Sequence, residues 1–400
     1  MVIRRNWAPE PYLLVLFAGI IIAQFLDYLF RSQPWVFGQP PAILVMLGAV
    51  AVSVLLWLLT KAQGRMTGLP LMVFLGMLVL WVAVLVNYRL DNAAFTYAAI
   101  TAPIILLMLI FKPPGAKQAW RLADFTFALI GMLALLAQIL DWVGLREART
   151  TIYSRWSLPF TDLDLGYRWE GFFGDPNNAG LMGAIMVVYG LHRRGWLRGG
   201  LLATGALVVL FSESRTSLVA LAAGVLVTAL TSRRYRELKL VPWVRTVIAS
   251  AAAATALVLV FLTDPSLNGR AQIWEAYLTL WQESPVFGVG ADGLGSAISN
   301  GEIPWDTIDG HSVLFDALTR HGVLVAVLIA GILLGALAQA WRARNCDAGT
   351  SLSIIAAWLF GALTYTLTEW LYINVLVIPL ILALLLAQGR TSNYRKPSHD

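Results

Sequence analysis

The chain has 400 residues, of which 58% are hydrophobic and 13% are charged, and its mean hydropathy is +0.70. A soluble domain carries about a quarter charged residues, so this composition excludes an ordinary soluble enzyme and indicates an integral membrane protein. The one cysteine, Cys346, excludes an internal disulfide and a metal cluster built on cysteines.

Apolar runs long enough to cross a bilayer follow one another along most of the chain. They predict twelve spans, near 12–30, 42–60, 69–87, 93–111, 122–142, 172–191, 197–212, 214–231, 244–262, 322–340, 351–371 and 373–389. The division near 212–216 is the weakest. We therefore expect an all-α polytopic membrane protein with about twelve transmembrane helices. Nine of them fall in 1–262 and three in 322–389, and 390–400 form a tail.

Basic residues give the expected orientation of these spans. With the N-terminus in the cytoplasm, 20 of the 29 lysines and arginines fall on that side, as the positive-inside rule requires. The other side receives 18 of the 23 acidic residues, so the formal net charge of +6 hides a basic inner face and an acidic outer face. A basic inner face suits anionic lipid headgroups, so we expect membrane lipids and no nucleic acid as partners. Both termini are predicted to be cytoplasmic.

Two predicted outer loops are long enough to carry a site, 143–171 and the large loop 263–321. In the large loop, a helical period is predicted from about 268 to 283, ended by Pro285. One face of this helix holds Ile273, Trp274, Tyr277, Leu278 and Trp281. Such a face favours a helix that lies in the membrane interface, with Arg270 near headgroup depth. Arg270 is then either a contact to lipid phosphate or part of a binding site.

Arg215 lies between two predicted spans, where an arginine is costly unless it is paired. It either forms a structural pair with Glu213 or another outer carboxylate, or it joins Arg270 in binding a diphosphate. Guanidinium groups suit the second role because they bind phosphate oxygens in a bidentate fork.

His311 is the third candidate, with Asp309 and Asp316 close to it in the sequence. A carboxylate neighbour orients an imidazole and raises its basicity, although a histidine at a helix start can also be purely structural. Two arginines and one histidine would suffice to transfer a sugar from a polyprenyl diphosphate. The arginines stabilise the leaving diphosphate and the histidine takes the proton of the acceptor hydroxyl. Attack from the face opposite the diphosphate would invert the anomeric centre.

Two rival interpretations remain open. Asp162 and Asp164 have the Asp-x-Asp spacing that some glycosyltransferases use to hold a divalent ion, and no other His, Cys or Asp cluster has metal-ligand spacing. A secondary transporter would need buried charges near the bilayer midplane, whereas most ionisable residues here fall at span ends.

Four segments, in order across about 170–325, resemble the O-antigen ligase and polymerase superfamily. They are Gly171-Phe-Phe-Gly-Asp-Pro176-Asn177-Asn178-Ala-Gly180, Ser212-Glu-Ser-Arg215-Thr-Ser217, Arg270-Ala-Gln-Ile-Trp274 with Pro285-Val-Phe-Gly288-Val-Gly290, and Gly310-His311-Ser312 with Gly322.

The resemblance implies a GT-C-like glycosyltransferase of the bacterial inner membrane that needs no metal or cofactor and faces the periplasm. Its donor would be a glycan on undecaprenyl diphosphate. By this resemblance Arg215 and Arg270 bind the lipid diphosphate and His311 is the base. The supporting candidates are Arg168, Asn177, Asp309 and Trp274.

The expected acceptor is lipid A–core, which would make the protein an O-antigen ligase. A polymerase that uses a second lipid-linked repeat as acceptor is the alternative, because Ser312 stands where the family's ligases often have Asn.

Overall fold

Helices form nearly all of the described chain. The computed structural model describes residues 10–30, 40–60, 68–87, 103–145, 149–150, 168–231, 270–303, 312–342, 348–364 and 377–388. Its helices are α1 (Pro11–Phe30), α2 (Pro40–Leu59), α3 (Leu69–Asn87), α5 (Ala116–Trp142), the 3-10 helix η1 (Gly171–Phe173), α6 (Pro176–Leu191), α7 (Gly195–Ser212), α8 (Arg215–Thr231), α11 (Arg270–Glu283), α12 (Gly290–Ser299), α13 (Val313–Arg342), α14 (Ala348–Thr364) and α15 (Val377–Gln388). Residues 103–111 are helical as well.

The protein is a multi-pass helical membrane protein. Within the described ranges, five helices are long and apolar enough to cross a bilayer, and α8, α14 and α15 are among the shorter apolar ones. Each predicted run contains helical residues except 244–262, which lies outside the described residues. The count of twelve spans stays a prediction. Helices suit this setting because each satisfies its own backbone hydrogen bonds where no water is available.

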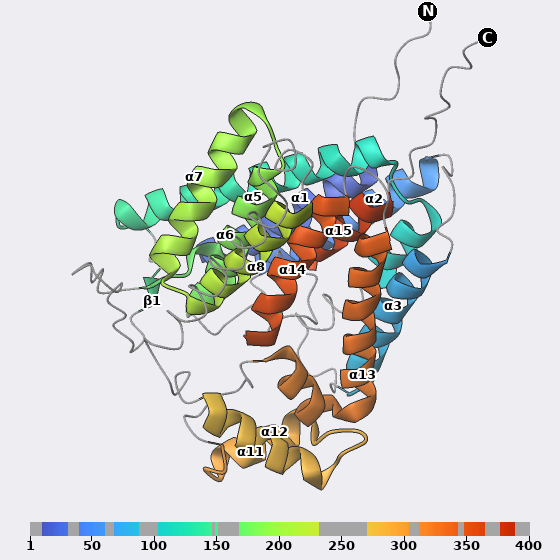
Figure 1. The fold of residues 1–400 in the computed structure, drawn as a ribbon, viewed down its shortest axis with the longest axis vertical. Helices are drawn as coiled ribbons and strands as arrows, with labels where there is room; N and C mark the ends of the chain where they lie inside the picture. The colour runs from blue at the N-terminus through green and yellow to red at the C-terminus, as the bar shows by residue number, and fades with distance from the viewer. Residues whose placement is uncertain are drawn as a thin grey trace, which may run out of the picture.

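Figure 1 shows two regions of unequal size. Most helices form one bundle, in which α6 packs against α7, α8 and α14, and α13 packs against α3 and α14. The helices α11 and α12 lie beyond one end of this bundle and contact the first part of α13. This smaller unit corresponds to the large loop predicted over 263–321.

A two-residue antiparallel ladder is the feature that the all-α prediction did not include. Strand β1 (Arg149–Thr150) pairs with β2 (Arg168–Trp169), with Arg149 opposite Trp169 and Thr150 opposite Arg168. The ladder fixes the end of the predicted loop 143–171 where the chain enters η1 and α6. Asp162 and Asp164 lie outside the described residues.

The helix ends that were predicted to share the inner side contact one another. Gln118 Nε2 donates to Glu10 Oε1 at 2.9 Å, and Lys112 Nζ donates to the carbonyl of Thr60 at 2.5 Å. His192, which follows α6, has its Nε2 3.2 Å from Thr228 Oγ1 and 3.4 Å from Ser353 Oγ. These contacts agree with the predicted alternation of the spans.

His192 is a buried structural histidine at this end of the bundle. Burial lowers its pKa to about 4, so the ring is neutral at physiological pH. Both contacts are made by Nε2, and the Thr228 and Ser353 hydroxyls donate to the Gly224 and Gly349 carbonyls at 2.8 and 2.6 Å. Nε2 therefore carries the proton of the neutral ring and donates it to the two hydroxyl oxygens.

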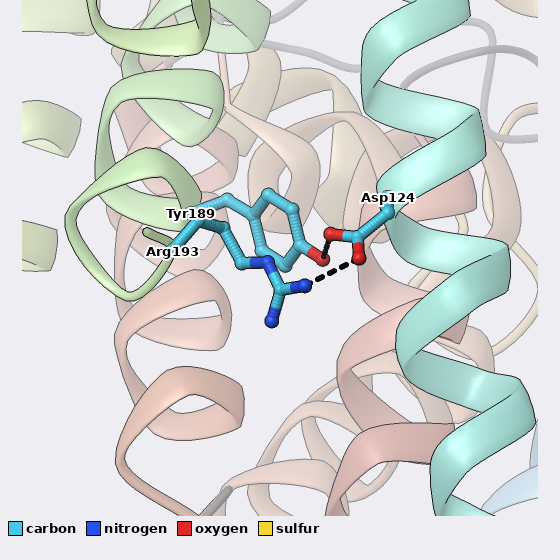
Figure 2. A network of polar contacts seen from close by, with 3 residues as sticks. All are labelled: Asp124, Tyr189 and Arg193. Atoms are coloured by element: carbon cyan, nitrogen blue, oxygen red, sulfur yellow. Dashed lines mark hydrogen bonds and ion pairs between the residues drawn. The ribbon is translucent and has the colours of Figure 1, made fainter. Parts of the chain in front are cut away.

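A charged network ties α5 to the turn after α6 at the same end (Figure 2). The Tyr189 hydroxyl donates to Asp124 Oδ1 at 2.6 Å, and the Arg193 guanidinium pairs with Asp124 Oδ2. The guanidinium also lies over the Trp120 ring, 4.6 Å from its centroid. Because both charges are only about a quarter exposed, each depends on the other to offset its lost hydration.

We expect Asp124→Ala to lower the free energy of unfolding by about 1.5–3 kcal/mol, because it leaves the Arg193 charge half-buried without its carboxylate. Tyr189→Phe removes one hydrogen bond but keeps the aromatic ring, so its expected cost is only about 1 kcal/mol. Thermal unfolding in detergent measures both variants. Equal effects of the two would contradict a network centred on the Asp124 carboxylate.

Interfacial tryptophans mark both ends of the bundle. Trp196 lies in the first turn of α7 and Trp341 in the last turn of α13, at ends predicted to be cytoplasmic, while Trp142 ends α5 on the opposite side. All three side chains are exposed. Tryptophan prefers the boundary between lipid and water, so exposed tryptophans at helix ends fit a bilayer that surrounds the bundle.

Candidate functional site

Three of the site candidates, Arg168, Asn177 and Arg215, lie where α6 and α8 begin. Asp175 caps α6 by accepting from the backbone N–H groups of Asn177 at 2.6 Å and Asn178 at 3.4 Å, and Pro176 occupies the first helical position. An Asp-Pro pair is a strong start signal, because the carboxylate satisfies N–H groups that lack a helical partner and proline has none to satisfy.

A tight turn separates α7 from α8. The helix α7 ends at Ser212, Glu213 adopts a left-handed conformation with φ of 48°, and α8 begins at Arg215. Ser214 caps α8, since its Oγ accepts from the Ser217 backbone N–H at 3.2 Å. The weak division predicted near 212–216 is therefore confirmed as a break between two helices.

Asn177 joins these two helix starts to the end of the preceding loop. Its Oδ1 accepts from the Arg168 guanidinium at 3.1 Å and from the Ser214 hydroxyl at 3.0 Å. Arg168 also donates from Nε to the Ser212 carbonyl at 3.1 Å, which is one of the last acceptors of α7. Two of the four segments that carry the family resemblance, 171–180 and 212–217, are thus bound together through side chains.

Gly180 allows this close approach. A Cβ at that position would lie 2.5 Å from Ser212 Oγ and 2.8 Å from Ser217 Cβ, so no larger residue fits without moving the turn between α7 and α8. The sequence does not reveal Ser212 and Ser214 as members of this network. The only local signal was the run of small polar residues at a helix boundary.

The arrangement is suited to binding an anion. Arg168 and Arg215 lie at the same helix junction, where the N-termini of α6 and α8 also come together. A helix N-terminus carries a partial positive charge and attracts phosphate. Arg215 is half-buried, and a guanidinium in such a place interacts with a charged ligand more strongly than one in open water.

Arg270 and Trp274 lie on α11, in the smaller unit. Arg270 is the first residue of α11, and Trp274 stacks on Phe315 of α13 with ring centroids 5.0 Å apart and an interplanar angle of 14°. This contact holds α11 against the first turn of α13, which directly follows His311 and Ser312 in the sequence. His311 and Asp309 lie outside the described residues, so the meeting of His311 with the two arginines stays a prediction.

The predicted interfacial face of α11 has a different partner. Ile273 and Tyr277 are fully buried, and with Leu280 they form a small core against Leu294 and Ala297 of α12. The helical period was correct, but these residues pack inside the helical unit instead of facing lipid.

A cavity of about 330 Å³ lies between α11 and the end of α12. Its lining includes Glu275 and Glu283 of α11 and Glu302 after α12. Three carboxylates repel a diphosphate, so this cavity does not compete with the arginine-rich junction as the place for a lipid-linked donor. Across the described residues, no group of three or more His, Cys, Asp or Glu side chains is arranged to hold a metal ion.

Comparison with known proteins agrees with the resemblance seen in the sequence. Residues 200–330 match the family model described as O-antigen ligase. This part of the chain is similar to an O-antigen ligase domain. The matched segment contains Arg215, Arg270 and His311 and runs from within α7 into α13. None of the curated proteins searched matches the chain. The match points to a ligase- or polymerase-type glycosyltransferase activity at a membrane.

Proposed function

We propose that the protein is an inverting glycosyltransferase that moves a glycan from undecaprenyl diphosphate to an acceptor sugar hydroxyl. The observation that carries this proposal is the junction at which Asn177 binds Arg168 and Ser214, because it brings the two family segments and Arg215 to two helix N-termini. A diphosphate leaving group needs this kind of positive environment and no acid to protonate it.

In the proposed reaction, Arg215 and Arg270 bind the diphosphate oxygens and Arg168 supports the junction. His311 removes the proton of the acceptor hydroxyl as the new glycosidic bond forms. The bond between the anomeric carbon and the diphosphate breaks, and the diphosphate leaves with the electron pair. Asp309 orients His311, and Trp274 holds α11 in place through Phe315. The site faces the periplasm of a bacterial inner membrane.

The proposed acceptor is lipid A–core, which makes the protein an O-antigen ligase. The test is a purified assay in lipid nanodiscs with a carrier-linked glycan, to which lipid A–core and a second carrier-linked glycan are offered in parallel. Glycosylated lipid A–core supports the ligase, and elongated carrier-linked chains would instead identify a polymerase. No product with either acceptor would overturn the proposal.

We expect transfer to continue at its full rate in EDTA, because two guanidinium groups supply the positive charge that a divalent ion provides in other transferases. The measurement compares initial rates before and after chelation. A rate that falls and then returns with added Mg²⁺ or Mn²⁺ would point to Asp162 and Asp164 instead.

A further inference from the structure

The turn between α11 and α12, residues 285–287, is fixed to α13 at its kink. The Val323 backbone N–H donates to the Pro285 carbonyl at 2.9 Å, and the Val289 N–H donates to the Thr319 carbonyl at 2.8 Å. Trp281 Nε1 also donates to the Pro285 carbonyl, at 2.9 Å. The 285–287 turn therefore cannot move independently of the kinked segment of α13.

The kink itself requires glycine. Gly322 has φ of 76° and ψ of −179° inside α13, and a Cβ there would lie 2.1 Å from the Val286 carbonyl oxygen. Side chains disfavour this backbone conformation, and the neighbouring main chain leaves no space for one.

We expect Gly322→Ala to detach the 285–287 turn and to lower the free energy of unfolding by about 2 kcal/mol or more. The matched control is Gly331→Ala in the same helix, where a Cβ would meet nothing within 4 Å. Its expected effect is neutral or stabilising by up to about 1 kcal/mol. Thermal unfolding in detergent compares the two, and equal stability of both variants would contradict a required kink.

The 285–287 turn presents large apolar side chains away from the protein. Phe287 is 69% exposed and Val286 is 46% exposed, although both are held by a well-bonded backbone. Polar side chains occupy the neighbouring exposed positions Gln282 and Glu283. An exposed apolar pair with a polar border is typical of a surface that contacts another apolar phase.

The membrane-crossing part of α13 begins at Gly322, next to the 285–287 turn. From Gly322 to Ala340 the sequence has no charged residue. Leu324 and Val327, in the first turns after the kink, are 59% and 64% exposed, as expected of side chains that face lipid. Since Val323 bonds directly to Pro285, the exposed pair is continuous with this lipid-facing surface.

We propose that the 285–287 turn inserts Val286 and Phe287 among the hydrocarbon chains of the bilayer leaflet next to α11 and α12. The inserted turn and the kink at Gly322 together hold α11 at a fixed depth, so that its first residue, Arg270, stays at the level of the lipid headgroups. This anchoring role does not depend on the reaction that the protein catalyses.

Spin labels on single cysteines test the insertion in the full-length protein. Cys346→Ser provides the background, since the chain has one cysteine. Labels are then placed by Phe287→Cys, by Leu324→Cys as the lipid-facing reference, and by Ser299→Cys as the exposed aqueous reference on α12. In lipid vesicles, collision with oxygen reports hydrocarbon, and collision with a soluble nickel chelate reports water.

The oxygen-to-nickel collision ratio at 287 is expected to be several-fold above that at 299 and close to that at 324. A ratio at 287 equal to that at 299 would overturn the proposal. Protection from both reagents would overturn it too, because a protein partner would then cover the turn. Val286→Cys provides a second position if the Phe287 variant does not fold.

Discussion

Replacing Arg215 with alanine should reduce glycan transfer by about 100- to 1000-fold, the usual effect of removing one group that stabilises developing negative charge. Arg215→Lys should still lose about 10- to 100-fold, because lysine keeps the charge but cannot form the bidentate fork, and a hydrogen bond to a charged group contributes about 1.5–3 kcal/mol. Initial rates with carrier-linked glycan, measured over a range of donor concentrations, give both values.

The fold around Arg215 should survive these changes. Ser214 caps α8 through its own hydroxyl and bonds to Asn177, and neither contact uses the Arg215 side chain. A matched control is Arg342→Ala, which removes an exposed arginine from the C-terminal end of α13 and should keep the full rate. Full activity of Arg215→Lys would rule out a bidentate contact and leave only a point charge.

The same logic applies to Arg270, the first residue of α11. We expect Arg270→Lys to weaken donor use as Arg215→Lys does, and the double lysine variant to lose less than the product of the two single effects. Residues that bind one ligand together are not independent, so their effects on the transfer rate do not multiply. Fully multiplicative effects would show that the two arginines act at separate places.

Properties that depend on local sequence were predictable. Apolar runs of about 20 residues located the helices, and the polar residues between 212 and 216 located the break between α7 and α8. The Asp175-Pro176 pair also marks the start of α6 locally, through a cap whose signal lies in adjacent residues.

Properties that depend on packing between distant segments were not predictable. The bond from Arg168 to the Ser212 carbonyl joins residues 44 positions apart. It depends on the close approach of α6 to the turn between α7 and α8, which Gly180 allows because it has no side chain. The face of α11 shows the same limit: its period predicted Tyr277 on an apolar face in the membrane interface and could not show that other helices cover it. In the structure α12 and the first part of α13 provide that cover.

His311→Ala should have the largest effect on chemistry, a loss of about 100- to 10,000-fold in the rate of transfer with donor binding retained. The proposed base acts only on the acceptor hydroxyl, so its removal leaves the diphosphate contacts of the arginines in place. Single-turnover rates with saturating donor isolate this step, and binding of a labelled carrier-linked glycan is measured on the same sample.

Two companion variants make the result specific to His311. Asp309→Asn should lower the rate by a smaller factor, since it removes an orienting charge but keeps the base. Glu302→Gln, at an exposed position after α12, should keep the full rate. The following helix is already held in place: Ser312 is buried, its carbonyl accepts from the Asp316 N–H at 2.9 Å, and Phe315 stacks on Trp274. A His311→Ala protein that folds, binds donor and transfers glycan at the normal rate would therefore remove the base from the mechanism and leave a reaction driven by the diphosphate site alone.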